Sequence, residues 1–228
     1  TMANKKRAVA VFPGRGSYAG AELGYLTKHH SSRMNLIDAL DARRSKNGAT
    51  PTLELDQMEK FSPSKHLPGR NASNLIYTCA QADFLAIDDD KIEIVAVCGN
   101  SLGWYLTLAA SGALSLEDGA HLVDTMGSLM EREGVGGQLL CPISDEFWRV
   151  SPDHRKHVLQ VIADTDNAFI SIDLEGTLVI AGDNGAIKQL QAELRAPDGS
   201  TLVQLPKHAA FHTPLLNDVA ETARSLLS

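Results

Sequence analysis

Ser101 lies in the pentapeptide Gly99–Gly103, a Gly-x-Ser-x-Gly pattern in which a serine can act as the nucleophile of acyl transfer or hydrolysis. In this pattern a sharp turn between a strand and a helix exposes the serine hydroxyl. The two glycines are needed because side chains there would collide with the neighbouring strand and helix. The backbone N–H of Leu102 then faces developing negative charge at the start of the helix. We interpret Ser101 as a nucleophile; an ordinary Gly/Ser turn is the alternative.

A serine nucleophile needs a base, and eight histidines are available. His212 is favoured because it lies where a loop meets the last predicted helix, just before Pro214, which suits a first helical turn. His208 is a weaker competitor, and His121 is expected on a helix. The other histidines lie in polar surroundings and are expected at the surface: His29, His30, His66, His154 and His157.

The segments around Ser101 predict alternating strands and helices. Ile92–Cys98 is a near-continuous apolar run, typical of a buried central strand of a parallel sheet, and the serine pentapeptide follows it directly. Arg7–Phe12 predicts a second strand, which the breaker Pro13–Ser17 ends. Residues 46–71 predict an irregular connection with at most one short helix. Helices are predicted at 20–29, 33–45, 74–87, 104–110 and 115–133.

The character of the sequence changes at the glycine-rich segment Gly134–Gly137. A strand, a helix, two strands, a helix and a strand are predicted after it, which is the ferredoxin-like order βαββαβ. These elements are predicted at 138–142, 152–163, 168–173, 177–181, 184–195 and 201–205. An amphipathic helix is predicted over Thr213–Leu227. The pattern therefore favours an α/β protein with a ferredoxin-like subdomain.

The composition is that of an ordinary globular chain of 228 residues, with 43% hydrophobic and 21% charged residues. A net charge of −7 argues against a general nucleic-acid binder. Cys79, Cys98 and Cys141 lie in apolar runs and indicate buried thiols in a reducing compartment. No apolar run reaches the roughly 18 residues of a membrane span, and we see no signal peptide. Thr1 before Met2 indicates a tag remnant, and a cytoplasmic location is expected.

Four motifs in this order resemble the malonyl-CoA:acyl-carrier-protein transacylase family, which includes the acyltransferase domains of polyketide and fatty-acid synthases. Val11–Ser17 is similar to the family's Phe-Pro-Gly-Gln-Gly-Ser, and Gly99–Gly103 is similar to its Gly-His-Ser-Leu-Gly. Gly176–Gly182 is similar to its Gly-Gln-x-Val-Ile-Ala-Gly, and Phe211–Leu216 to its Phe-His-Ser/Thr-Pro-Leu-Met. The resemblance covers nearly the whole chain.

The resemblance implies an α/β-hydrolase-like core with a parallel sheet and an inserted ferredoxin-like subdomain. The core would comprise residues 1–134 and 206–228, and the subdomain residues 135–205. Family members continue with further strands and helices after the histidine motif. This chain stops soon after that motif, which indicates either a truncated form or a partner that supplies the rest.

The family's mechanism implies a Ser–His dyad in which backbone carbonyls, not an aspartate, orient the histidine. Ser101 would attack an acyl thioester while His212 takes its proton and returns it to the leaving thiol. The N–H groups of Leu102 and Arg15 would hold the oxyanion. The implied substrates are acyl-CoA and phosphopantetheine thioesters, and the implied partner is an acyl-carrier protein. No metal, other cofactor, nucleic acid or membrane is implied.

Met126 is the most informative departure from the family. Members that use malonyl groups carry an arginine in the helix after the nucleophile, and it forms a bidentate pair with the substrate carboxylate. Aligning Gly127 and Met130 with the family's Arg-Gly-x-x-Met puts Met126 at that arginine position. A thioether leaves a buried carboxylate unpaired, which is costly. We therefore expect a neutral acyl group; Arg132, two turns away, is a weak substitute.

Other departures surround the nucleophile. Asn100 replaces a histidine of the family, Trp104 replaces an acidic residue, and Arg15 replaces a glutamine. Asn100, Trp104 and Gly14 are expected, with Met126, to contact the substrate. Trp104 either fills core volume or narrows the acyl pocket. Arg15 keeps its backbone N–H, and its side chain is either solvated or in contact with the phosphates of CoA or phosphopantetheine.

Three functions follow from these residues. The first is an acyltransferase that moves a neutral acyl group between CoA and an acyl-carrier protein. The second is a thioester hydrolase that clears acyl groups from the carrier protein, with water in place of the second thiol. The third is a catalytically weak family member that serves as a carrier-protein docking module.

Overall fold

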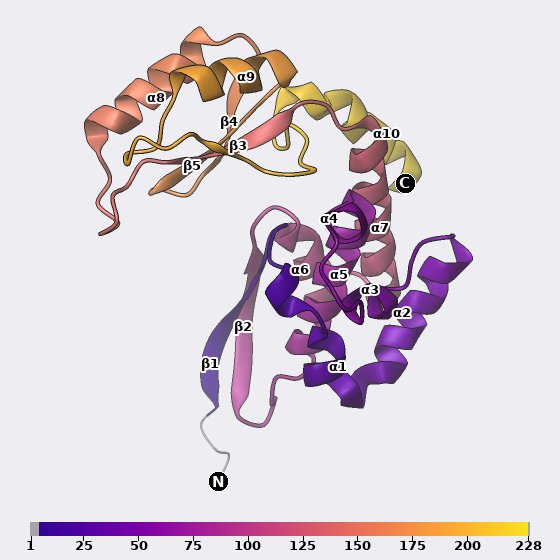
Figure 1. The fold of residues 1–228 in the computed structure, drawn as a ribbon. Helices are drawn as coiled ribbons and strands as arrows, with labels where there is room; N and C mark the ends of the chain where they lie inside the picture. Colours follow the sequence, from indigo (N-terminus) through magenta and orange to yellow (C-terminus); the bar gives the residue numbers. More distant parts are fainter. Residues whose placement is uncertain (1–4, 228) are drawn as a thin grey trace. The chain divides into compact units, whose positions relative to one another are not determined.

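The computed structural model describes residues 5–227 and divides into two compact units, 1–128 and 129–228 (Figure 1). Helix α7, Leu116–Glu133, crosses the division. The mixed α/β architecture, with a parallel sheet in one unit and an antiparallel sheet in the other, confirms the predicted fold class. The predicted core and subdomain boundaries stay a prediction, and Thr1 lies outside the described residues.

The first unit is built on two parallel strands, β1 (Lys6–Phe12) and β2 (Ile92–Gly99). Phe12 pairs with Gly99, so the loops that follow both strands leave the same edge of the sheet. Within the described chain β2 pairs with β1 alone, and Val95 on β2 is 40% exposed. The prediction that β2 is buried like a central strand is therefore wrong, because helices cover one face of this sheet and leave its other face open.

Helices supply most of the core of the first unit. The predicted irregular segment 46–71 contains two short helices and the start of a third, so that prediction underestimated its helical content. The helices are α1 (Tyr25–His30), α2 (Met34–Lys46), α3 (Thr52–Asp56), α4 (Pro63–His66), α5 (Gly69–Phe84) and α6 (Gly103–Ala110), with single 3-10 turns at Gly20–Glu22 and Ser31–Arg33. Leu26, Leu75, Leu106 and Val123 are fully buried among them.

Two histidines expected at the surface are buried in this unit. His30 Nε2 lies 2.7 Å from the Asp83 carboxylate, and His66 Nε2 lies 2.9 Å from the carbonyl oxygen of Leu55. The His66 ring also stacks on Phe61, with 4.6 Å between ring centroids. The prediction failed because both rings find hydrogen-bond partners that are distant in sequence, and such partners make burial of a polar ring tolerable.

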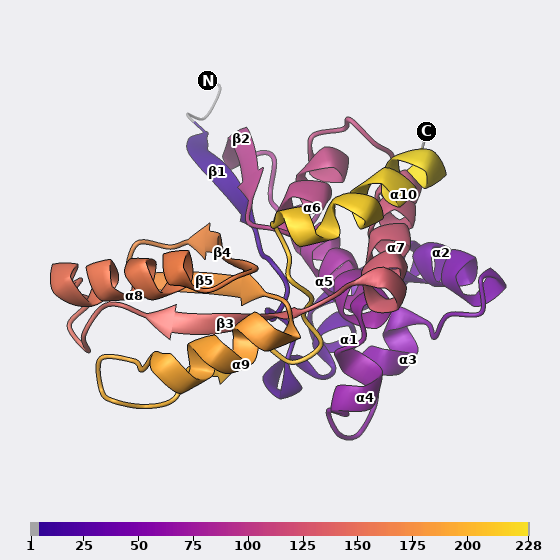
Figure 2. The ribbon, with the colours of Figure 1, turned by 90° about the horizontal axis from the view of Figure 1, so that it is seen from above.

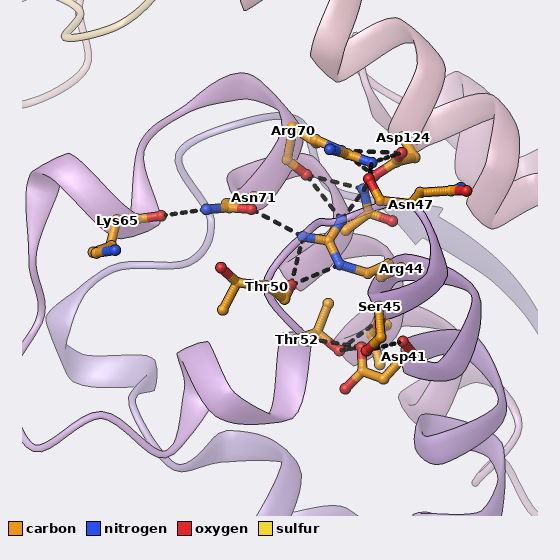
Figure 3. Close-up of polar contacts among 12 residues, drawn as sticks. Asp41, Arg44, Ser45, Asn47, Thr50, Thr52, Lys65, Arg70, Asn71 and Asp124 are labelled. Carbon is orange, nitrogen blue, oxygen red and sulfur yellow. Dashed lines mark hydrogen bonds and ion pairs between the residues drawn. The ribbon is translucent and has the colours of Figure 1, made fainter.

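A buried ionic cluster joins α2, α5 and α7 (Figure 3). The Asp124 carboxylate accepts hydrogen bonds from Arg44 at 2.9 Å and from Arg70 at 3.0 Å. The Arg44 side chain is only 4% exposed, and burial lowers the pKa of its guanidinium. Its guanidinium also donates to the backbone carbonyl oxygens of Thr50 and Arg70 and to the side-chain oxygen of Asn71. Losing one partner of such a cluster leaves a buried charge uncompensated, so the cluster fixes α7 against α5.

The second unit contains the predicted ferredoxin-like order. Its antiparallel sheet has the strand order β4-β5-β3-β6, and α8 and α9 lie side by side over it (Figure 2). Apolar residues from both helices and from the strands, such as Val158, Leu190, Leu139 and Ile180, form one core. The elements are β3 (Gly137–Pro142), α8 (Pro152–Asp164), β4 (Ala168–Asp173), β5 (Thr177–Gly182), α9 (Asn184–Glu193), β6 (Val203–Gln204), a 3-10 turn (Pro214–Leu216) and α10 (Asn217–Leu227).

None of the helices within residues 5–227 combines the length and the apolar character needed to span a bilayer. The same residues contain no cluster of three or more histidine, cysteine, aspartate or glutamate side chains that could hold a metal ion.

Candidate active site

Ser101 sits on the sharp turn that the sequence predicts between β2 and α6. Its φ angle is +54°, in the left-handed region that a non-glycine residue occupies at a cost. A Cβ on Gly99 would overlap the backbone of Gly103, and a Cβ on Gly103 would overlap the carbonyl oxygen of Phe12. The turn therefore requires both glycines for close approach of backbones, and it holds the serine in one strained conformation.

Replacing Gly103 with alanine is expected to destabilise the first unit by about 1–3 kcal/mol, because the added methyl group meets rigid backbone and not a flexible side chain. Urea unfolding followed by circular dichroism measures this change. Gly20→Ala is the matched control, since a Cβ there would meet only Phe61 at an ordinary 3.5 Å. Equal midpoints for the two variants would contradict the close approach at Gly103.

The loop after β1 packs directly against the nucleophile turn. The Asn100 N–H donates to the carbonyl oxygen of Phe12 at 3.2 Å. A Cβ on Gly14 would lie 3.0 Å from the Asn100 carbonyl oxygen and 3.6 Å from Ser101 Cβ. The structure thus brings Gly14, Asn100, Ser101 and Leu102 together at the amino end of α6, where the helix dipole favours negative charge. Their roles with substrate stay predictions.

Two interpretations were open for each of Arg15 and Trp104, and the structure excludes one of them in each case. The Arg15 guanidinium is half-buried and donates to the carbonyl oxygen of Leu67 at 2.9 Å, so it is not a fully solvated surface group. Trp104 is 60% exposed, so the interpretation that it fills core volume is wrong. Its backbone N–H bonds to the Ser101 carbonyl at 3.0 Å, which places the indole on the first turn of α6. Contact with substrate stays a prediction for both.

Met126 is half-buried on a turn of α7 that is held firmly against α5. A Cβ on the neighbouring Gly127 would lie 2.6 Å from the carbonyl oxygen of Gly69, so the two helix backbones touch there. Asp124, two residues earlier, is bound by Arg44 and Arg70. Residue 126 is therefore presented by a fixed helical turn. That it contacts the acyl group stays a prediction.

His212 lies in the second unit, in the loop before α10, with a left-handed φ of +60°. Desolvation by the surrounding protein lowers the pKa of its imidazole below the usual 6.5, although the residue as a whole is exposed. The neutral imidazole, which is the form that can accept a proton, therefore predominates at pH 7. Ser101 belongs to the first unit, and the pairing of the two side chains stays a prediction.

A cavity of about 430 Å³ lies beside β1 and α5, and Ser101 is not among the residues that line it. Phe12, Tyr18, Ile76 and Phe84 line it, together with Cys79. Burial raises the pKa of the Cys79 thiol well above its usual range, and burial raises that of Cys141 to about 11. Cys79 and Cys141 are buried as predicted and stay protonated at neutral pH, so neither competes with Ser101 as a nucleophile, whereas Cys98, also predicted to be buried, is only half-buried.

Two polar side chains around the His212 loop, Gln138 and Ser171, were not among the residues that the sequence pointed to. Gln138 on β3 contacts both His208 and Ser171, and Ser171 on β4 contacts the Phe211 carbonyl. In the sequence Gln138 is simply the first residue of a predicted strand, and no neighbouring residue indicates its role in this network. His208, the weaker candidate for the base, is a member of this network.

The fold of this chain is similar to that of solved malonyl-CoA:acyl-carrier-protein transacylases. The malonyl-CoA:acyl carrier protein transacylase of Xanthomonas oryzae pv. oryzae superposes with a TM-score of 0.75 and 26% identity, covering 100% of this chain and 71% of that one. The complex of a type II polyketide synthase acyl-carrier protein with its malonyl-transacylase gives a TM-score of 0.75 at 18% identity, covering 97% and 69%.

The chain is also similar in sequence to curated proteins of polyketide biosynthesis. Polyketide biosynthesis protein ThaF of Burkholderia thailandensis is 28% identical over 216 residues, covering 91% of this chain. Mycoketide-CoA synthase of Mycobacterium tuberculosis is 25% identical over 226 residues, covering 94%. The chain spans only 17% and 5% of these two relatives. No protein-family model matches it. These comparisons confirm the resemblance to the transacylase and polyketide synthase acyltransferase family.

Proposed function

We propose that the chain is an acyltransferase that moves an acyl group between CoA and an acyl-carrier protein through an acyl-Ser101 intermediate. The observation that carries this proposal is the strained turn at Ser101, enclosed by Gly99 and Gly103 at the start of α6. The likeness to transacylases, one of them solved with its carrier protein, supports the reaction and the partner. Free thiols such as Cys79 fit a reducing cytoplasm, where we place the reaction.

The proposed reaction has two matched halves. Ser101 Oγ attacks the thioester carbonyl while His212 accepts the hydroxyl proton. The oxyanion lies between the N–H groups of Leu102 and Arg15, and its collapse expels a thiolate that takes the proton from His212. The phosphopantetheine thiol of the carrier protein then attacks the Ser101 ester in the same way, with His212 again taking and returning the proton.

The proposed acyl group is neutral. Met126 offers no positive charge to a carboxylate, and Arg44 and Arg70 on the helices packed against α7 already bind Asp124. A malonyl carboxylate taken into such surroundings would lose its hydration without gaining an ion pair. We infer that unsubstituted acyl-CoAs such as acetyl-CoA acylate Ser101 faster than malonyl-CoA does.

Intact-mass spectrometry after incubation with a panel of acyl-CoAs tests both the reaction and the acyl group. The wild-type chain is expected to gain an acetyl mass on Ser101 in preference to a malonyl mass. Met126→Arg is expected to raise malonylation about 10-fold or more, because a bidentate ion pair becomes available. Met126→Leu is the matched control and should leave the preference unchanged. Preferential malonylation of the wild-type chain would refute the neutral acyl group.

Acceptor assays separate transfer from the hydrolase alternative. Release of free acid from acyl-carrier protein, without formation of a new thioester, would identify a hydrolase that uses water as acceptor. Labelling of Ser101 by a fluorophosphonate probe, lost in His212→Ala, would exclude the docking-module alternative, because a dead site does not activate its serine.

A further inference from the structure

A chain of hydrogen bonds runs from β3 to the loop that carries His212. Gln138, only 2% exposed, has its Oε1 2.8 Å from His208 Nδ1 and its Nε2 2.7 Å from Ser171 Oγ. The Ser171 hydroxyl in turn lies 2.8 Å from the carbonyl oxygen of Phe211, the residue before His212. All of these groups belong to the second unit, so the chain is internal to that unit.

The direction of every hydrogen bond in this chain follows from its last member. A carbonyl oxygen only accepts, so Ser171 must donate its hydroxyl proton to Phe211 and accept from Gln138. The amide nitrogen of Gln138 therefore faces Ser171, and its oxygen faces His208. Nδ1 of His208 consequently carries a proton, as it does in both the matching neutral tautomer and the imidazolium. These hydrogen bonds are therefore compatible with both forms of the His208 ring.

The last hydrogen bond of this series holds the peptide plane that precedes a residue with a strained backbone. The Phe211 carbonyl belongs to the peptide bond that joins Phe211 to His212, and His212 has a φ of +60°. A left-handed non-glycine residue costs about 1–2 kcal/mol and persists only where its surroundings enforce it. On the other side of His212, the Thr213 hydroxyl donates to the carbonyl oxygen of Ala210 at 2.7 Å. Hydrogen bonds therefore hold the backbone on both sides of His212.

We propose that Ser171 and Gln138 are positioning residues for the imidazole of His212. Ser171 fixes the peptide plane before His212, and the buried amide of Gln138 fixes the direction in which the Ser171 hydroxyl points. The inference rests on the proposed function, in which His212 is the base. A base displaced by a fraction of an ångström still binds the same substrate but transfers the proton more slowly.

Ser171→Ala tests this role, because it removes the hydroxyl and little volume. Single-turnover acylation of Ser101 by acetyl-CoA is expected to slow roughly 10-fold to 100-fold at saturation, with an unchanged half-saturating concentration. Ser171→Thr keeps the hydroxyl and is expected to restore most of the rate. Gln138→Leu, which fills a similar volume without the amide, should reproduce the Ser171→Ala result.

Ser144→Ala is the matched control, since its hydroxyl also donates to a backbone carbonyl, that of Gly176 at 3.1 Å, in the same unit. It should lose a similar amount of stability in urea and keep its acylation rate. Equal rates for Ser171→Ala and Ser144→Ala, or no recovery in Ser171→Thr, would overturn the positioning role while leaving the proposed function intact. A wild-type chain that fails to acylate would overturn both.

Discussion

Ser101→Ala is expected to abolish acyl-enzyme formation, with a fall of at least about 10³-fold in the rate of acylation by acetyl-CoA. The acyl group has no other nucleophile to join at this turn, because the Ser101 hydroxyl is the side chain that the strained φ of +54° presents at the start of α6. Intact-mass spectrometry of the wild-type and variant chains, mixed with the same acyl-CoA, measures the loss. An acyl mass that persists at the same rate in the variant would refute Ser101 as the nucleophile.

Ser101→Gly is the companion variant that separates function from folding. Glycine occupies the left-handed region without penalty. The free energy of unfolding of this variant is therefore expected to be about 1 kcal/mol higher than that of Ser101→Ala, which raises its urea midpoint. It should be equally inactive, since it also lacks the hydroxyl. The difference in stability between these two inactive variants measures the backbone strain that a side chain brings to this turn.

The parts of this structure that short-range patterns control were predictable. The elbow follows from glycines two residues either side of a serine, placed after an apolar run. The ferredoxin-like order follows from the succession of short strands and amphipathic helices after Gly134–Gly137. Turn chemistry and periodicity are local properties, so the residues that express them stand close together in the sequence.

The parts that depend on distant partners were not predictable. The apolar run of β2 does not reveal how many strands lie beside it, and within the described residues only β1 does. Burial of His66 depends on the Leu55 carbonyl, and the Gln138–Ser171 pair joins residues from two different strands. Trp104 is of a residue type common in cores, yet it is 60% exposed, as is Leu108 one helical turn later on α6 at 38%.

Asp124 illustrates how such distant partners affect the site. In the sequence it is one acidic residue of the predicted helix 115–133, and no neighbouring residue indicates its partners. In the structure its carboxylate accepts hydrogen bonds from Arg44 and Arg70 and from a third residue, Asn74, whose amide lies at 3.1 Å. The helix turn that presents Met126 is thus fixed by charges that no local pattern reveals, and the same charges become unavailable to a substrate carboxylate.

The pH dependence of acylation should report on His212. Burial lowers the pKa of its imidazole below 6.5, so the neutral, proton-accepting form persists to lower pH than in an unfolded chain. The acidic limb of the acylation rate is therefore expected to have its midpoint below pH 6.5. His212→Ala should lower the rate at pH 7 by about 10²-fold to 10⁴-fold and remove this limb. Single-turnover rates between pH 5 and 8 measure both effects.

The same shift fixes the sign of the stability change with pH. Because the folded chain holds the neutral form more strongly, the unfolded chain binds the proton first as the pH falls. The contribution of His212 to stability is therefore present above pH 6.5 and is lost as the pH falls toward the lowered pKa of the folded state. His157→Ala, at an exposed position in the same unit, should change neither the rate nor this dependence. If His208→Ala lowers the acylation rate more than His212→Ala does, His208 and not His212 is the base.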